Sequence, residues 1–236
     1  MSRRILVICL FIALMVYTRR VLAQEHNFSM SLRGSFTTSS RLFTDPNSSS
    51  AFQRSQYFSL DNFFGYGVEL RYQFTESNIA IGLSSDYIKA TTERSLPRLS
   101  TSSPVVPIED GYTVVPVELT GYFLIPISGQ TFGVYMGGGV GGYFGKRDYM
   151  LGNTDAPTIA SGHGFGIHVL GGVSYRFTDW FSLNAEMKFR DLQFETTNQF
   201  ASRTVTYRGL VIPVDRLDSS IHTDGVIFQL GTVFHI

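Results

Sequence analysis

Apolar side chains alternate with polar or small ones in eight stretches of this 236-residue chain, and the pattern is clearest at its end. From Val226 to Ile236 every second residue is apolar or Thr. A period of two is typical of a β-strand with one apolar face. No stretch after residue 24 has apolar residues at helical spacing, so the chain is predicted to be all-β. The predicted strands are 27–38, 63–74, 79–88, 112–125, 131–145, 163–177, 181–190 and 225–236.

The connections between these strands alternate between long and short. They contain about 24, 4, 23, 5, 17, 3 and 34 residues in chain order, and the long ones are rich in Ser, Thr, Pro, Asn and Asp. Even-stranded outer-membrane barrels have short periplasmic turns and longer external loops. The sequence therefore predicts an eight-stranded antiparallel up-and-down transmembrane β-barrel with periplasmic N- and C-termini.

Charged residues within the predicted strands all fall on the face opposite to the aromatic-rich one. An Arg or Lys exposed to lipid at mid-depth costs about 2–4 kcal/mol, so the aromatic-rich face is predicted to face lipid. A soluble carrier barrel would have the opposite arrangement, with its apolar face inside. Eight strands leave an interior that side chains fill, so the inward charges are expected to form an ion-pair plug, with a gated polar pathway as the alternative. These residues are Arg33, Glu69, Arg71, Asp86, Glu118, Arg176, Glu186, Lys188 and Arg190.

Aromatic residues recur near the strand ends that are predicted to be periplasmic. Aromatic side chains gather at membrane–water interfaces, where their rings sit at the level of the headgroups. We therefore expect an interfacial girdle at this end of the barrel. Its members are Tyr72, Phe74, Phe177, Trp180 and Phe181.

Residues 1–23 have the features of a secretory signal peptide. Arg3 and Arg4 precede an apolar run of about thirteen residues, and Ala23 is a small residue suited to cleavage. A signal anchor and a twin-arginine signal are the alternatives. The single cysteine, Cys9, lies in this segment, so no disulfide is expected after cleavage. Without the four arginines of this segment, 15 basic residues remain against 19 acidic ones. The mature chain is mildly acidic, and it has no basic patch that would indicate nucleic-acid binding.

The last strand carries a second motif, formed by Gln229, Gly231, Phe234 and Ile236. This spacing resembles the C-terminal assembly signal of the small single-domain bacterial outer-membrane β-barrel superfamily, the OmpA/OmpX/OmpW-like barrels, although Phe is the usual last residue there. The resemblance implies one barrel domain over residues 24–236, localised to the bacterial outer membrane. It also implies contact with outer-membrane lipid and lipopolysaccharide, folding on the barrel-assembly machinery, and a monomer.

The sequence contains no convincing catalytic site. Gly137–Gly142 contain the letters of a phosphate-binding loop but lie inside a strand, where they are expected to leave room for Tyr135 and Tyr143. No His precedes a Ser by two residues, as the barrel lipid A deacylases require, and His163 and His168 fall on opposite strand faces. We therefore expect no metal, no cofactor and no enzyme activity.

The sequence is consistent with three functional hypotheses. The first is a non-enzymatic barrel with surface-exposed loops that serves envelope structure, adhesion or surface interaction. The second is passive, porin-like transport of small or hydrophobic solutes, and the third is a lipid-modifying hydrolase. The loop at 191–224 contains Phe194, Phe200 and Leu210. It is interpreted either as a hairpin above the membrane or as a contact surface for another protein, a host surface or lipopolysaccharide.

Overall fold

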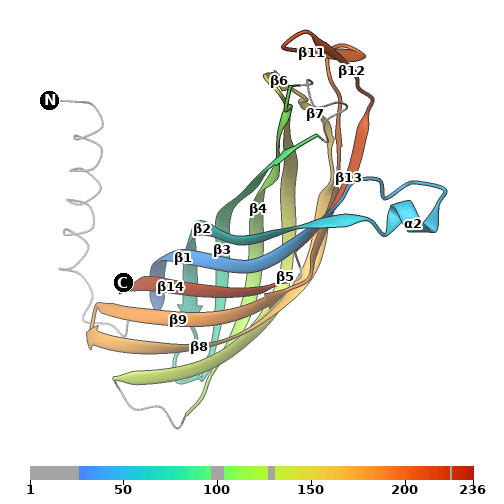
Figure 1. Cartoon of the computed structure of the whole chain (residues 1–236). Coiled ribbons are helices and arrows are strands. Elements are labelled where there is room, and N and C mark those ends of the chain that lie inside the picture. The colour runs from blue at the N-terminus through green and yellow to red at the C-terminus, as the bar shows by residue number, and fades with distance from the viewer. Residues whose placement is uncertain (1–26, 97–103, 127–130, 224) are drawn as a thin grey trace, which may run out of the picture.

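The computed structural model describes residues 27–96, 104–126, 131–223 and 225–236. The predicted signal peptide and most of the predicted turn at 126–130 lie outside these residues. Eight long antiparallel strands form a closed ring (Figure 1). Pairing of the last strand with the first, through Gly34 and Leu230 among others, closes it. In order around the ring the strands are β1 (Phe28–Phe43), β2 (Tyr57–Gln73), β3 (Ile79–Ser95), β4 (Pro107–Leu124), β5 (Phe132–Leu151), β8 (His163–Thr178), β9 (Phe181–Arg190) and β14 (Val226–His235).

The eight predicted strands are confirmed, but five of them are longer than predicted at the end with the long loops. β3, for example, continues to Ser95 instead of residue 88, and β5 continues to Leu151 instead of residue 145. The added residues carry charges on both faces, as Lys89 and Arg94 show, because they lie beyond the apolar belt. The placement of all charges on one strand face therefore identified the membrane-spanning segments, but it did not predict where the strands end.

Beyond the ring, the long loops form an ordered part that we call the external extension. It comprises the upper ends of β1–β5, short strands whose pairing continues that of the ring, the separate two-stranded sheet of β11 and β12, and the short helix α2 (Figure 1). β10 pairs with β13 as the predicted hairpin of the fourth loop, and β11 with β12 at its tip. The elements are α2 (Ala51–Arg54), β6 (Thr154–Asp155), β7 (Thr158–Ser161), β10 (Leu192–Asn198), β11 (Thr204–Tyr207), β12 (Leu210–Pro213) and β13 (Leu217–Thr223).

β2 and β3 separate near the long-loop end of the barrel. Their pairing ends at Gly65 and Ile88, after which β2 pairs with β1 and β3 pairs with β4. Asn62 has a φ of 57°, a left-handed conformation that an L residue rarely adopts within a strand. This residue interrupts the alternation of β2, so Leu60 and Phe63 are both buried. The wall is therefore continuous through the apolar belt and divided above it.

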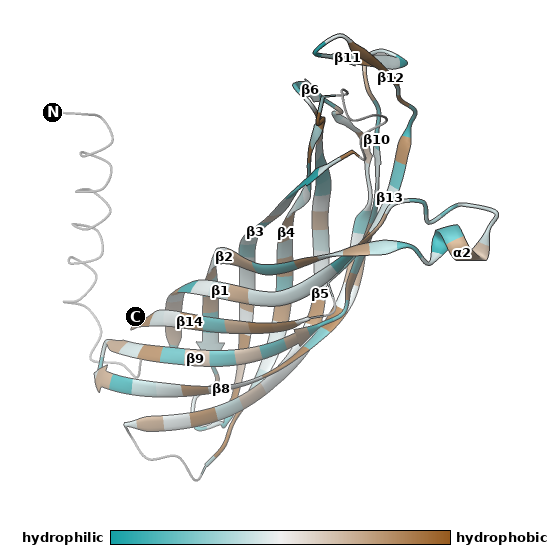
Figure 2. Ribbon diagram, in the orientation of Figure 1, coloured by the Kyte–Doolittle hydropathy of each residue, from teal (hydrophilic) through white to brown (hydrophobic). Residues whose placement is uncertain are grey.

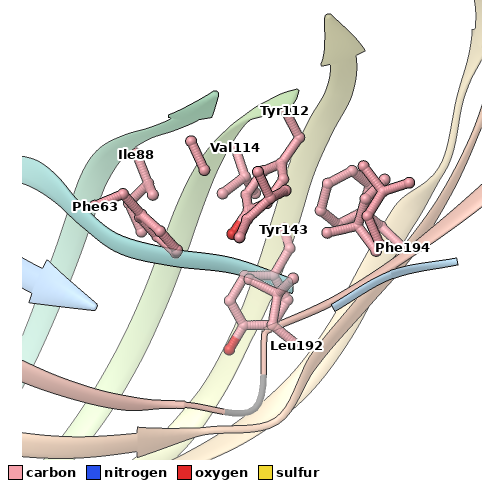
Figure 3. Packing of buried hydrophobic residues seen from close by; sticks show 11 residues of the cluster. Phe63, Ile88, Tyr112, Val114, Tyr143, Leu192 and Phe194 are labelled. Carbon is pink, nitrogen blue, oxygen red and sulfur yellow. The ribbon is translucent and has the colours of Figure 1, made fainter. Parts of the chain in front are cut away.

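Apolar and polar residues alternate along the ring strands (Figure 2), and the exposures place the apolar side chains on the outer wall and the polar ones inside. Leu70 is 57% exposed and Ile167 is 64% exposed, whereas Glu69 and Glu118 are buried. Inside, a cluster of Tyr122, Tyr135 and Leu170 lies toward the short turns. A larger apolar cluster lies toward the long loops and includes Phe63, Ile88, Tyr112, Val114, Tyr143, Leu192 and Phe194 (Figure 3).

Inward-facing glycines make room for the tyrosines of the interior; the predicted segment of β5 supplies Gly141 for Tyr143, whereas Gly172 of β8 leaves the space for Tyr135. A Cβ atom on Gly172 would come within 2.6–2.7 Å of the Tyr135 ring, and one on Gly141 would lie 3.0 Å from the Tyr143 hydroxyl. Both distances are too short for an unstrained carbon contact. The Gly-rich segment of β5 is thus a packing feature of the wall.

Candidate functional site in the barrel interior

The inward charges of β1, β2 and β3 meet halfway along the barrel. Arg33 binds Glu69 at 2.8 Å and Asp86 at 2.9 Å, and all three side chains are buried. Arg71 extends this group by binding Glu69 at 2.8 Å and Glu186 at 3.2 Å. Their positions follow from the strand register, because Arg33 pairs with Gly67 and Gly67 pairs with Asp86. Gly67 leaves the space that these two long side chains occupy, since a Cβ there would lie 2.0 Å from the Asp86 carboxylate.

Glu118 of β4 holds the other half of the network. One carboxylate oxygen accepts from Lys188 Nζ at 2.8 Å, and the other accepts from Arg190 Nε at 2.6 Å. Arg190 also donates to Asp86 at 3.0 Å and thereby joins the two halves. The joined network contains four basic and four acidic side chains, so it has no formal net charge. A neutral, fully connected network is the arrangement in which buried charges are tolerated.

Arg176 is the exception among the nine predicted network residues. Its side chain is exposed near the short-turn end of β8, beside the irregularity between Arg176 and Thr178. The prediction that it belongs to the plug is therefore wrong. Its parity is inward, but the position lies so close to the barrel end that solvent reaches it.

Neutral side chains that were not predicted to contact the network surround it. Tyr135 donates to Glu186 at 2.8 Å, and Tyr143 donates to Glu118 at 3.3 Å. The Arg71 guanidinium lies 3.8 Å from the centre of the Tyr122 ring, a cation–π contact. His168 faces inward, with Nε2 2.9 Å from Thr120 Oγ1, whereas His163 is exposed on the other face. Inward parity was the signal that could have identified these residues.

The four residues of the predicted C-terminal signal each make different contacts in the structure. Gln229 points inward and is buried, and no hydrogen bond to its side-chain amide is seen within the described residues. Gly231 allows Asn184 to approach, because a Cβ would lie 2.4 Å from its Oδ1. Phe234 lies against Trp180 and Phe181, and the Ile236 amide donates to the Phe28 carbonyl at 2.8 Å. The assembly role itself stays a prediction.

The predicted girdle residues contact other aromatic rings at the short-turn end. Tyr72 lies 4.8 Å from Phe28 and 5.2 Å from Phe74, measured between ring centroids. Phe177, Phe181, Trp180 and Phe234 form a second group, with centroid distances of 5.6–6.3 Å. An interfacial function for these two groups stays a prediction.

A second buried ion cluster lies in the external extension, beyond the predicted strand ends. Arg147 binds Asp110 through two hydrogen bonds of 2.8 and 2.6 Å and also donates to Ser219. Arg94 approaches the same carboxylate at 2.5 Å. Asp110 is fully buried and Arg147 is 3% exposed. Such bidentate pairs fix both partners, so the cluster links β4, β5 and β13 above the membrane.

Apolar residues of the fourth loop pack inside the external extension. Phe194 belongs to the cluster above the ion network, and Phe200 and Val205 pack with Ile108 and Leu151. Burial raises the pKa of the nearby Tyr149 hydroxyl above its usual value. The apolar character of this loop therefore reflects its own core, which favours the interpretation as a hairpin over that of a contact surface formed by these residues.

The described residues contain no group of three or more His, Cys, Asp or Glu side chains placed to hold a metal ion. No helix among them is long and apolar enough to cross a membrane.

A closed antiparallel ring with an apolar exterior and a neutral ionic interior defines a membrane-spanning β-barrel. Residues 9–212 match the family described as outer membrane protein beta-barrel domain, and the chain belongs to that family. It is a protein of the bacterial outer membrane. The predicted fold class, family and location are thereby confirmed.

Similarity to one solved structure supports the fold alone. The outer membrane protein OprG from Pseudomonas aeruginosa is 14% identical, with 87% of this chain and 94% of that chain covered and a TM-score of 0.54. Neisserial surface protein A is 14% identical, with coverage of 89% and 97% and a TM-score of 0.46. Escherichia coli outer membrane protein W is 12% identical, with coverage of 91% and 100% and a TM-score of 0.39. No sequence among the curated proteins matches this chain.

Proposed function

We propose that this protein is a non-enzymatic surface protein, in which a plugged barrel anchors a rigid external extension that binds partners outside the cell. The observation that carries the proposal is the continuous strand pairing from the ring into the external extension. β4 and β5 stay paired from Leu124 and Tyr135 up to Ile108 and Leu151. A preorganised surface loses little conformational entropy when it binds a partner.

The barrel interior supports an anchoring function. The eight charges of the network, seven of them buried and Arg71 partly buried, and the apolar cluster above them fill its centre. Passage of an ion would require the network to separate, which costs several kcal/mol for each buried charge left unpaired. The purified protein should therefore show no discrete conductance steps in planar bilayers.

The direct test removes the tip of the external extension. Val214 donates to the Arg203 carbonyl at 2.9 Å, so the ends of the β11–β12 hairpin are adjacent and a Gly-Ser turn can replace residues 204–213. Cells expressing the shortened protein should lose adherence to the immobilised glycans or matrix proteins that retain wild-type cells. The heat-dependent gel mobility of the folded barrel should be unchanged. Equal adherence of both cell types would contradict the proposal.

Transport of hydrophobic solutes is the second candidate, and the separation of β2 from β3 favours it. Arg94 on β3 bridges the two strands, because its guanidinium lies 3.7 Å from the centre of the Phe58 ring on β2. A solute that entered the mouth would leave between these strands above the apolar belt and reach the membrane from its outer surface. Arg94→Ala should then accelerate uptake of a lipophilic fluorescent probe by whole cells, and unchanged uptake would exclude this route.

Lipid hydrolysis was the third hypothesis, and the proposal leaves no place for it. Overexpression of the protein should therefore leave the mass of lipid A unchanged.

A further inference from the structure

Four side chains from three strands gather on the outer surface of the external extension. We call Arg41, Phe43, Tyr57 and His222 the rim platform. The ring centroid of Phe43 lies 4.8 Å from His222 and 5.4 Å from Tyr57. The Arg41 guanidinium lies 5.5 Å from the centre of the Tyr57 ring. Register brings these residues together, because β1 pairs with β2 on one side and with β13 on the other.

The rim platform faces away from the barrel interior. The neighbours of its residues along the chain, Leu42 and Ile221, are both fully buried on the opposite face. Tyr57 is 50% exposed, and the other three side chains are partly exposed. The buried neighbours therefore fix the strands that carry the aromatic rings, and the ring faces remain accessible from the side of the molecule.

The height of the rim platform places it above the phospholipid headgroups. The aromatic pair Phe36 and Phe64, 5.2 Å apart, marks the upper limit of the apolar wall, since Asp61 and Asn62 follow it on β2. Phe43 is seven residues beyond Phe36 on the same strand. At a rise of about 3.3 Å per residue and a tilt of about 40°, it lies about 18 Å higher. Headgroups extend only about 5–8 Å beyond the hydrocarbon.

We propose that the rim platform binds the saccharide of an outer-leaflet glycolipid that lies beside the barrel. Aromatic rings offer apolar faces to the C–H groups of sugar rings, while polar neighbours bind the hydroxyls. Gln193 pairs with His222, and Glu195 pairs with Ser220, so an amide and a carboxylate flank the aromatic rings. A saccharide attached to a membrane lipid is the occupant that fits a sideways-facing surface at this height.

The charges around the rim platform favour sugar hydroxyls over phosphate as its ligands. Arg41 is the basic residue of the platform. Two acidic residues lie nearby, Glu195 on β10 and Asp191 directly before it. Burial is the main cause that lowers the pKa of His222 below its ordinary value, and the positive charge of Arg41 lowers it further, so this ring is neutral at pH 7. A neutral imidazole has one donor and one acceptor nitrogen, and because Nε2 already lies 3.0 Å from Ser220 Oγ, Nδ1 is the atom that would bind a sugar hydroxyl.

The test uses the full-length protein in phosphatidylcholine nanodiscs and soluble core oligosaccharide released from lipopolysaccharide. Saturation-transfer NMR should detect binding, and the double variant F43A/Y57A should bind at least tenfold more weakly. Tyr57→Phe should retain binding, because the ring face is kept. Phe52→Ala is the matched control, since Phe52 is an exposed aromatic residue of α2 outside the platform.

Heat-dependent gel mobility establishes that each variant is folded. Absence of binding by the wild-type protein, or equal binding by F43A/Y57A, would overturn the inference. Loss of binding in Phe52→Ala as well would also overturn it, because the site would then not be confined to the platform. This site is separate from the β11–β12 tip, so either proposal can fail without the other.

Discussion

Glu118→Gln tests whether the interior is held by a connected ion network. The Glu118 carboxylate binds Lys188 and Arg190 and also accepts from Tyr143. After the substitution, Arg190 still has Asp86 as a partner. Lys188, in contrast, makes one ion pair within the described residues, and its partner there is Glu118. Lys188 is fully buried, so its charge would be left without compensation.

The expected loss of unfolding free energy is about 3–5 kcal/mol, the usual cost of removing one partner from a buried ion pair. Equilibrium urea unfolding in lipid vesicles, followed by tryptophan fluorescence and by heat-dependent gel mobility, measures it. The double variant E118Q/K188M removes the uncompensated charge together with its partner, so it should regain most of the loss. Arg176→Gln is the control, and its exposed position should keep the change within about 0.5 kcal/mol.

A loss below about 1 kcal/mol in Glu118→Gln, equal to that in Arg176→Gln, would refute this reasoning. It would mean that water reaches Lys188 and that the interior is an open polar pathway.

Three further predictions concern the outer wall and the external extension. Leu70→Arg puts a charge on the lipid-facing wall and should cost about 2–4 kcal/mol and impair insertion, as an insertion assay in vesicles would show; Leu210→Arg, on a half-buried side chain of the extension, should insert normally and loosen only the hairpin. Asp110→Asn leaves Arg147 buried without its carboxylate, so limited proteolysis should cut the extension while the barrel stays protected. Arg41→Gln should raise the pKa of His222 toward 6.5 in an NMR titration. Because the folded-state pKa is the lower one, the stability from neutral His222 is present above about pH 6.5 and is lost as pH falls through the folded-state value.

The membrane part of this fold could be predicted from the sequence because lipid imposes a strict physical rule. Every residue of the outer wall must be uncharged, so parity alone assigned Glu69 and Lys188 to the interior. Strand register then decides which charges meet, and the sequence does not show the register. A plug could therefore be predicted, but not that Arg33 would bind both Glu69 and Asp86.

The external extension was harder to predict because water accepts charges on either strand face. Asp110 and Arg147 lie beyond the apolar belt, so no periodic signal marked them as a buried pair. Similarly, Phe194 and Phe200 could belong to an exposed surface or to a small core, and only the tertiary contacts decide between the two. The error at Arg176 has a related cause, since parity predicts the face of a strand but not the distance from its end.

Tryptophan quenching by brominated lipids tests most directly that this sheet closes on itself with its apolar face toward lipid. In a Trp180→Phe background, tryptophan is placed at the consecutive positions 122 and 123 of β4. Phe123 is 46% exposed on the outer wall, and Tyr122 is 2% exposed inside the barrel. Strong quenching of Phe123→Trp and weak quenching of Tyr122→Trp are predicted. Equal quenching, or stronger quenching at position 122, would contradict the inside-out arrangement.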